Sequence, residues 1–194
     1  MGRVTERFKY GTKEIIATVS GCFLMVCVRW LESYLLKAGV IDEQILDWVM
    51  LKLLVVAITA VFFGPISGCI TGLGGQLLIG VIFGGDISYD VLLVLGFYGF
   101  VMGLYFGKMH YDRKNYTMRT FVDFNAVQIM LGIICLLFLI PMSDFMIKDM
   151  DLNDGVVTGA KRLVGSILVI GTICPAIMMT VSAVTGSLGG GRKA

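Results

Sequence analysis

The chain has 194 residues, of which 57% are hydrophobic and 15% charged, and its formal net charge at pH 7 is +2. Soluble domains contain about 45–50% apolar and 25% charged residues. This composition, with a mean hydropathy of +0.86, excludes a domain surrounded by water and predicts an all-α integral membrane protein. The length suits one compact membrane domain covering residues 1–194. The first apolar run is too long for a signal peptide, and none is expected.

Apolar segments of spanning length follow one another along the chain. A spanning helix needs about 20 apolar residues, and the stretch from Trp48 to Phe83 is about 50 Å long at 1.5 Å per residue, too long for one crossing. Gly64-Pro65 divides it, because proline is favoured at the first position of a new helix. We expect Pro141 to close the fifth helix and Pro175 to kink the sixth. The predicted bundle has six helices, at about residues 14–36, 47–63, 65–83, 89–107, 120–140 and 158–184.

Charge predicts the orientation of this six-helix bundle. Basic residues gather in three segments that an even number of helices places on one side: Arg3, Arg7, Lys9 and Lys13; Lys108, Arg113, Lys114 and Arg119; Arg192 and Lys193. Acidic residues gather on the other side: Asp42, Glu43, Asp47, Asp86, Asp90, Asp144, Asp149, Asp151 and Asp154. Cytoplasmic loops carry an excess of Lys and Arg. The N- and C-termini are therefore expected in the cytoplasm.

Small residues at four-residue spacing predict close helix packing, because lipid supplies no hydrophobic force between helices. One row, Gly64, Gly68, Gly72, Gln76, Gly80 and Gly84, drifts around the third helix and implies more than one close neighbour. Gly99, Gly103 and Gly107 form a row on the fourth helix. On the first helix, Ala17 and Gly21 serve either the bundle or a partner protein, and the spacing leaves both open.

Ionisable residues inside spans mark functional sites by default. Arg29 and Glu32 share a face in the outer half of the first helix, and Lys52 lies about one turn into the second. Aromatic walls with a few convergent polar groups describe a small-molecule pocket, and Trp30 and Tyr34 add aromatic surface at this level. The predicted substrate-binding residues are Arg29, Glu32, Trp48, Lys52, Gln76, Tyr89, Lys161 and Arg162.

The same residues also suit purely structural roles. Arg29 and Glu32 could pair only with each other, and the lysines and Arg162 could snorkel to the interface. Trp48 and Tyr89 also suit an interfacial aromatic belt. Three polar residues near the cytoplasmic end of the fifth helix are interpreted as packing or gating groups: Asp123, Asn125 and Gln128.

Soluble-type catalysis has no basis in this sequence. The five cysteines lie in apolar runs without metal-ligand spacing, and His110 is far from them, so neither a metal nor a cofactor is expected. There is no P-loop and no nucleophile elbow, so the chain is not expected to be an enzyme, and ATP-driven transport would need another subunit. A nucleic-acid partner is not expected.

Several segments, in order, resemble the substrate-binding S component of energy-coupling factor (ECF) vitamin importers, and the riboflavin-type S-component family in particular. They are Lys13-Glu-Ile-Ile-Ala-Thr-Val-Ser-Gly, Phe63-Gly-Pro-Ile-Ser-Gly-Cys-Ile-Thr-Gly, Gly99-Phe-Val-Met-Gly-Leu-Tyr-Phe-Gly-Lys, Phe124-Asn-Ala-Val-Gln and Pro141-Met-Ser-Asp. The resemblance implies a multi-pass subunit of a prokaryotic-type plasma membrane. Such a subunit captures a vitamin or related small water-soluble metabolite from outside and delivers it inward with a T subunit and two ATPases.

The resemblance also assigns roles to positions. Ala17 and Gly21 match the family's small-residue motif that touches the T subunit, and the loop at residues 37–47 matches the cap over the site. Lys52 and the Lys161-Arg162 pair depart from the family pattern. They suggest a ligand with an anionic group and put riboflavin itself in doubt.

A self-sufficient secondary transporter is the main alternative function, and such a protein usually shows inverted repeats, which this sequence lacks. An intramembrane enzyme acting on lipids would want clustered acids or histidines near one interface, whereas the acids here lie mostly in loops. A structural scaffold would not need Arg29, Glu32 and Lys52 within spans.

Overall fold

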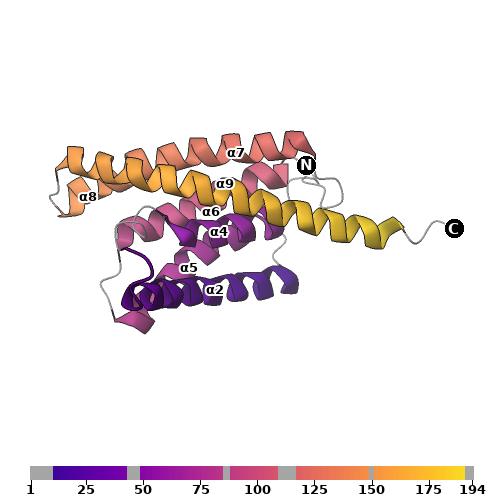
Figure 1. Cartoon of the computed structure of the whole chain (residues 1–194), viewed down its shortest axis with the longest axis horizontal. Coiled ribbons are helices and arrows are strands. Elements are labelled where there is room, and N and C mark those ends of the chain that lie inside the picture. Colours follow the sequence, from indigo (N-terminus) through magenta and orange to yellow (C-terminus); the bar gives the residue numbers. More distant parts are fainter. Residues whose placement is uncertain (1–10, 43–48, 85–87, 109–116, 149–150, 191–194) are drawn as a thin grey trace.

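The computed structural model describes residues 11–42, 49–84, 88–108, 117–148 and 151–190, and the regular elements in these segments are helices (Figure 1). In chain order they are α2 (Thr12–Lys37), α4 (Leu51–Phe63), α5 (Pro65–Phe83), α6 (Tyr89–Lys108), α7 (Met118–Gly132), the π-helix η2 (Ile133–Leu139), α8 (Ile140–Lys148) and α9 (Leu152–Gly190).

Five helices of the described segments are long and apolar enough to cross a membrane. They are α2, α5, α6, α9 and the continuous rod of α7, η2 and α8, whose apolar part runs Met118–Met146. The sixth, α4, has 13 residues, about 20 Å at 1.5 Å per residue, and is shorter than the roughly 30 Å hydrocarbon core. The all-helical membrane architecture predicted from the sequence is therefore present, with one short member.

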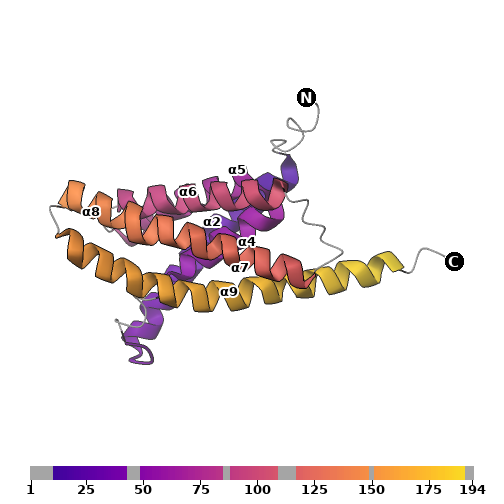
Figure 2. The ribbon, with the colours of Figure 1, turned by 90° about the horizontal axis from the view of Figure 1, so that it is seen from above.

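The helices pack in two groups that lie side by side. α5 contacts α2, α4 and α6, α4 contacts α2 and α6, and α9 packs antiparallel against the α7–η2–α8 rod. α4 also contacts α9 and so links the two groups. Figure 1 shows α7, α8 and α9 along one side, α2 and α5 along the other, and α4 and α6 between them. Figure 2 shows α2 crossing the others obliquely and the yellow end of α9 extending beyond the bundle. We call the second group, residues 118–190, the C-terminal hairpin.

Glycines let the backbones of α5 and α6 touch. A Cβ atom added at Gly72 would lie 2.5 Å from the carbonyl carbon of Leu95, and one at Gly68 would lie 2.7 Å from the carbonyl oxygen of Gly99. The added Cβ at Gly68 would also lie 2.6 Å from the Ala60 Cβ of α4. The prediction that this glycine row serves more than one neighbour is confirmed.

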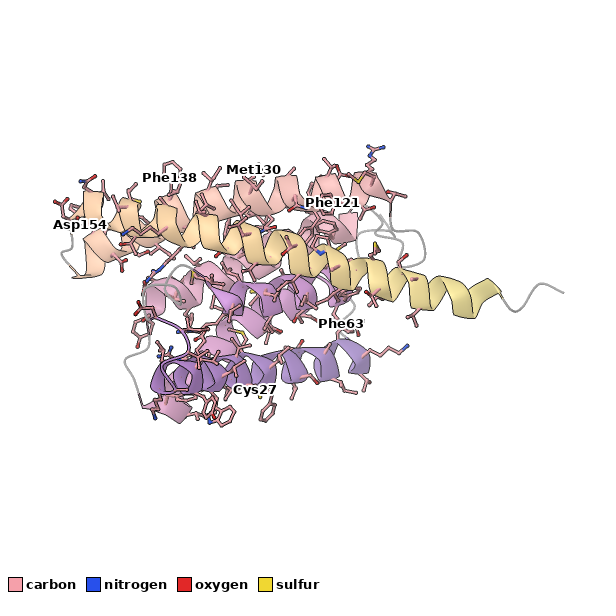
Figure 3. All side chains as sticks on the ribbon, in the orientation of Figure 1. Cys27, Phe63, Phe121, Met130, Phe138 and Asp154 are labelled. Atoms are coloured by element: carbon pink, nitrogen blue, oxygen red, sulfur yellow. The ribbon has the colours of Figure 1, made fainter. Side chains whose placement is uncertain are left out.

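Large apolar side chains divide between a buried core and an exposed outer surface. Met25, Leu95, Tyr98 and Phe124 are almost fully buried in the core. Figure 3 shows Met130 and Phe138 along the outer edge of the α7–η2–α8 rod, and Cys27 on the opposite side of the molecule. Phe138 is 65% exposed. In a bilayer such apolar outer faces meet lipid rather than water.

The expected end of the fifth helix at Pro141 is wrong. The rod continues through the π-helix η2 into α8, which ends at Lys148. Pro141 is the second residue of α8 and so lies inside the continuous rod, where its missing N–H removes one backbone hydrogen bond. The π-helix η2 has wider turns than an α-helix and leads directly to Pro141 without a break in the rod.

The last helix is longer than the predicted 158–184, since α9 runs Leu152–Gly190 and continues through Pro175. Its start is favoured by a local turn in which the Asn153 N–H donates to Asp151 Oδ1 at 3.1 Å. Asp154 in the first turn adds a favourable charge at a helix N-terminus. The remaining helix bounds lie close to the predicted ones, and α5 begins at Pro65 after Gly64, whose φ is +93°.

Candidate functional site

A cavity of about 270 Å³ lies at the end of the bundle where α2 ends and α4, α6 and α9 begin. Residues from every helix of the first group line it, and one residue comes from α9. The lining residues are Arg29, Glu32, Leu36, Val49, Met50, Lys52, Gln76, Ser88, Val91 and Arg162. Four of the ten are charged, so a polar chamber lies against apolar walls inside a membrane protein.

The α2 wall holds an ion pair. Arg29, Glu32 and Leu36 recur at three- and four-residue spacing, which places them on one face of the helix. Arg29 Nη1 lies 3.4 Å from Glu32 Oε2, and the Glu32 side chain is 7% exposed against 41% for Arg29. The buried carboxylate thus has a cationic partner, and that partner is itself partly open to the surroundings.

The opposite wall joins α4 to α5. Lys52 Nζ donates to Gln76 Oε1 at 3.4 Å. A lysine ammonium only donates hydrogen bonds, so the amide oxygen of Gln76 must face Lys52 and its NH₂ group points elsewhere. Lys52 also interacts electrostatically with Glu32, Arg29 and Arg162. These four charged side chains therefore converge on one space.

Arg162 is the contribution of the C-terminal hairpin to the described lining. It is half-buried near the start of α9. With Arg162 included, the described lining has three cationic side chains and one carboxylate. Two ion pairs of the described residues join Arg29 with Glu32 and Arg119 with Asp123, and neither includes Lys52 or Arg162, although Lys52 interacts electrostatically with Glu32.

The structure brings together five of the eight predicted substrate-binding residues: Arg29, Glu32, Lys52, Gln76 and Arg162. Tyr89 is 64% exposed at the start of α6 and does not line the cavity. Lys161 is exposed and does not line it either. Trp48 lies outside the described residues. Trp30 and Tyr34 stack on each other with ring centroids 5.9 Å apart on the exposed face of α2, so they supply no wall.

The walls are instead aliphatic, and sequence reasoning missed them. Leu36 lies four residues after Glu32, and this helical spacing was a usable signal for it. Val91 lies early in α6, and Val49, Met50 and Ser88 lie just outside helices. Periodicity gives no signal for residues in connecting segments.

The small residues of α2 differ in their surroundings. Gly21 is buried, and an added Cβ there would lie 2.9 Å from Thr71 Cγ2 and 3.1 Å from Thr59 Oγ1. Gly21 therefore packs against α5 and α4 of its own chain. Ala17, one turn earlier, is half-buried. The exposed apolar face of α2 is formed by other residues, including Phe23 and Trp30 at 61% exposure each.

The polar residues of α7 do not line the cavity. Gln128 is buried and its Nε2 donates to the Ser166 carbonyl of α9 at 3.2 Å. Asn125 Nδ2 donates to Phe121 O of its own helix at 3.0 Å, and Asp123 pairs with Arg119 at 3.8 Å. Gln128 thus joins the two arms of the C-terminal hairpin, a packing role, which is one of the two roles (packing or gating) that the sequence left open.

Known proteins share this sequence pattern. The family model described as ECF-type riboflavin transporter, S component, matches residues 47–185. A UPF0397 protein of Exiguobacterium sp. is 27% identical over 88% of this chain and 90% of its own length. A UPF0397 protein of Lactobacillus gasseri is 30% identical over 60% of this chain and 65% of its own length. A UPF0397 protein of Streptococcus gordonii is 26% identical over 91% of this chain and 92% of its own length.

No solved structure matches this chain. The family match covers most of the described helices and three of the five predicted residues that the cavity brings together, namely Lys52, Gln76 and Arg162. The resemblance to S components that the sequence motifs indicated is therefore confirmed. The chain belongs to the ECF-type riboflavin transporter S-component family and is a multi-pass protein of the cell membrane.

Proposed function

We propose that this protein is the substrate-capture subunit of an ECF-type ABC importer and binds a small, water-soluble, anionic vitamin or related metabolite in the cavity. The observation that carries the proposal is the convergence of Arg29, Lys52 and Arg162 on one chamber at one end of a membrane bundle. Concave sites with apolar walls and a few convergent polar groups are typical of small-molecule binding. Three cations beside a single carboxylate are unfavourable inside a membrane bundle without a further anion.

The proposed orientation makes this a capture site that faces outside. With the basic segments in the cytoplasm, α2 leads outward, and the cavity at its end opens toward the external side. The loop at residues 37–47, of which 43–47 lie outside the described segments, follows directly from the cavity wall at Leu36. It acts in this proposal as a cap that closes over bound ligand.

Inward delivery is assigned to partner subunits, because the sequence holds no ATP-binding motif. In this proposal a membrane T subunit and two ATPases complete the importer, and α2 supplies the contact surface for the T subunit. The Ala17 part of the small-residue motif remains available for that contact, while Gly21 packs inside the chain. The exposed apolar face of α2, with Phe23 and Trp30, extends the surface.

Affinity purification of the tagged protein from its native membrane tests the assembly. We expect a T-type membrane protein and ATPase subunits to co-purify, with uptake by proteoliposomes of the assembled complex requiring ATP. Uptake by proteoliposomes that contain this chain alone, driven by an ion gradient, would instead establish the secondary transporter and overturn the proposal.

A further inference from the structure

The charge of the cavity defines the ligand class more closely than the presence of cations alone. Building on the proposed capture function, we propose that the cavity recognises a dianionic phosphate monoester, held by Lys52 and Arg162 with the Gln76 amide as an additional donor. The ligand is thus the phosphorylated form of a small vitamin-like molecule, whose phosphate group enters this chamber.

Charge balance is the first step. Within the described lining, Glu32 neutralises Arg29 at 3.4 Å, and Lys52 donates its hydrogen bond to the neutral amide of Gln76. Neither the ion pair of Arg29 with Glu32 nor that of Arg119 with Asp123 includes Arg162. The buried Asp90 does not line the cavity. The described part of the lining, with three cationic side chains and one carboxylate, therefore has a surplus of two positive charges, which a dianion balances and a monoanion leaves half compensated.

The arrangement of donors is the second step. Lys52 fixes the amide oxygen of Gln76, so the Gln76 NH₂ is left as a donor. Together with the Arg162 guanidinium group and the Lys52 ammonium group, this NH₂ group gives the chamber hydrogen-bond donors from three helices. Glu32 is the one carboxylate of the described lining. A phosphate monoester presents three acceptor oxygens on one atom, which suits the fork of an arginine and a lysine point charge.

The third step is the convergence of the cations, which distinguishes a ligand with one phosphate group from a ligand with two distant carboxylates. Lys52, Arg29 and Arg162 line the same chamber of about 270 Å³, and Lys52 interacts electrostatically with Glu32 as well as with both arginines. The cations surround one small volume rather than lining the two ends of a long groove. A ligand with both negative charges on a single group fits this arrangement better than one whose charges are separated.

The test uses alcohols matched with their phosphate esters as probes: riboflavin with riboflavin 5′-phosphate, and pyridoxine with pyridoxine 5′-phosphate. Affinity for purified protein is measured by isothermal titration calorimetry, with pyridoxic acid and phthalate as monoanionic and dicarboxylate comparisons. We expect at least one phosphate ester to bind about tenfold or more tightly than its alcohol, since each charge-assisted contact contributes about one order of magnitude.

Variants locate that preference. Lys52→Met and Arg162→Gln are each expected to reduce the ratio of phosphate-ester to alcohol affinity about tenfold, and Arg162→Lys is expected to restore part of it. Lys161→Gln is the matched control, because Lys161 is the exposed neighbour of Arg162 outside the lining, and its ratio should equal that of the parent protein. Circular dichroism and size-exclusion profiles show whether each variant folds.

Equal or absent binding of the two members in both pairs overturns the phosphate proposal, and so does tighter binding of phthalate. A phosphate preference that survives both Lys52→Met and Arg162→Gln overturns the assignment to this cavity. These failures are distinct from failure of the capture function. A neutral or monoanionic compound that co-purifies together with a T subunit would support the capture function and contradict the phosphate proposal.

Discussion

Glu32 is the residue whose charge sets the balance of the cavity. Its side chain is 7% exposed and its cationic partner Arg29 is 41% exposed. A cationic partner offsets the cost of burying a carboxylate, and removing one member of such a pair leaves the charge of the other uncompensated. The pair therefore both stabilises the empty protein and limits how strongly the cavity attracts anions.

Glu32→Gln is predicted to weaken the empty protein and to strengthen anion binding. The amide keeps the shape of the side chain but leaves Arg29 without its carboxylate, so we expect a loss of about 1 kcal/mol, modest because Arg29 is partly solvated. Thermal unfolding should begin at lower temperature without ligand, and the upward shift on adding the anionic ligand should be larger than for the parent protein. A smaller shift would contradict this role of Glu32.

Gly72 makes a second prediction at the residue scale. Gly72→Val places a side chain where the Leu95 backbone of α6 already lies, since an added Cβ would be 2.5 Å from its carbonyl carbon. Backbone cannot yield as a side chain does, so we expect a destabilisation of about 3 kcal/mol or more. In detergent, the yield of monodisperse protein should fall sharply.

The matched control is Gly74→Ala on the same helix, where an added Cβ meets only Cys22 Sγ at 3.2 Å. A small displacement of that side chain accommodates the methyl group. Equal yields and equal unfolding temperatures for the Gly72 and Gly74 variants would show that the α5–α6 contact is looser than these distances indicate.

How well single residues could be predicted depended on the kind of signal. Arg29, Lys52 and Gln76 stand out in sequence because polar groups are rare in apolar runs, and the structure brings them to one cavity. Trp30 and Tyr34 stand out equally, yet they lie on the outer face of α2. Their face depends on which side of α2 the other helices occupy, and this tertiary information is not contained in hydropathy.

At the scale of elements, the C-terminal hairpin owes its packing to a close approach between α9 and η2. An added Cβ at Gly159 would collide with the Leu136 carbonyl oxygen. The π-helix η2 lies at this contact and leads into α8 past Pro141. Sequence rules for proline ended the fifth helix there because they cannot anticipate a π-helical stretch, which depends on what packs against it.

Gly159→Val is predicted to separate the two arms of the C-terminal hairpin locally. The new side chain would have to displace backbone at Leu136, so we expect faster hydrogen exchange in α8 and the start of α9, with the four-helix group less affected. Gly155→Ala is the milder comparison, because its Cβ would lie 3.2 Å from Pro141 Cα and Cβ, a tight contact but not a collision. Uniform acceleration across all helices would contradict local packing as the cause.

At the scale of the whole molecule, the cavity joins the two groups of helices. The walls from α2, α4, α5 and α6 belong to one group, and Arg162 belongs to the other. The sequence predicted the helical membrane architecture and the family from hydropathy and motif order. It also predicted Arg162 as a binding residue, but it did not predict that α9 begins as early as Leu152, because that start is favoured by a local turn at Asp151 and Asn153.

The orientation predicted from charge can be tested in intact cells with single cysteines in a cysteine-free background. Asp42→Cys lies beyond the cavity end of α2, and Thr117→Cys lies before α7 at the opposite end; both positions are exposed. A membrane-impermeant maleimide should label the first in intact cells and the second only after permeabilisation. The reverse pattern would place the cavity on the cytoplasmic side and contradict capture from outside.

Capture of a small anionic metabolite by this chamber is tested most directly by mass spectrometry of the compound that co-purifies with the protein expressed in rich medium. We predict an anionic vitamin-like compound that is retained by the parent protein and by Lys161→Gln, and largely lost from Lys52→Met and Arg162→Gln. A neutral compound retained equally by all four proteins, or no retained compound in any of them, would contradict capture of an anion at this site.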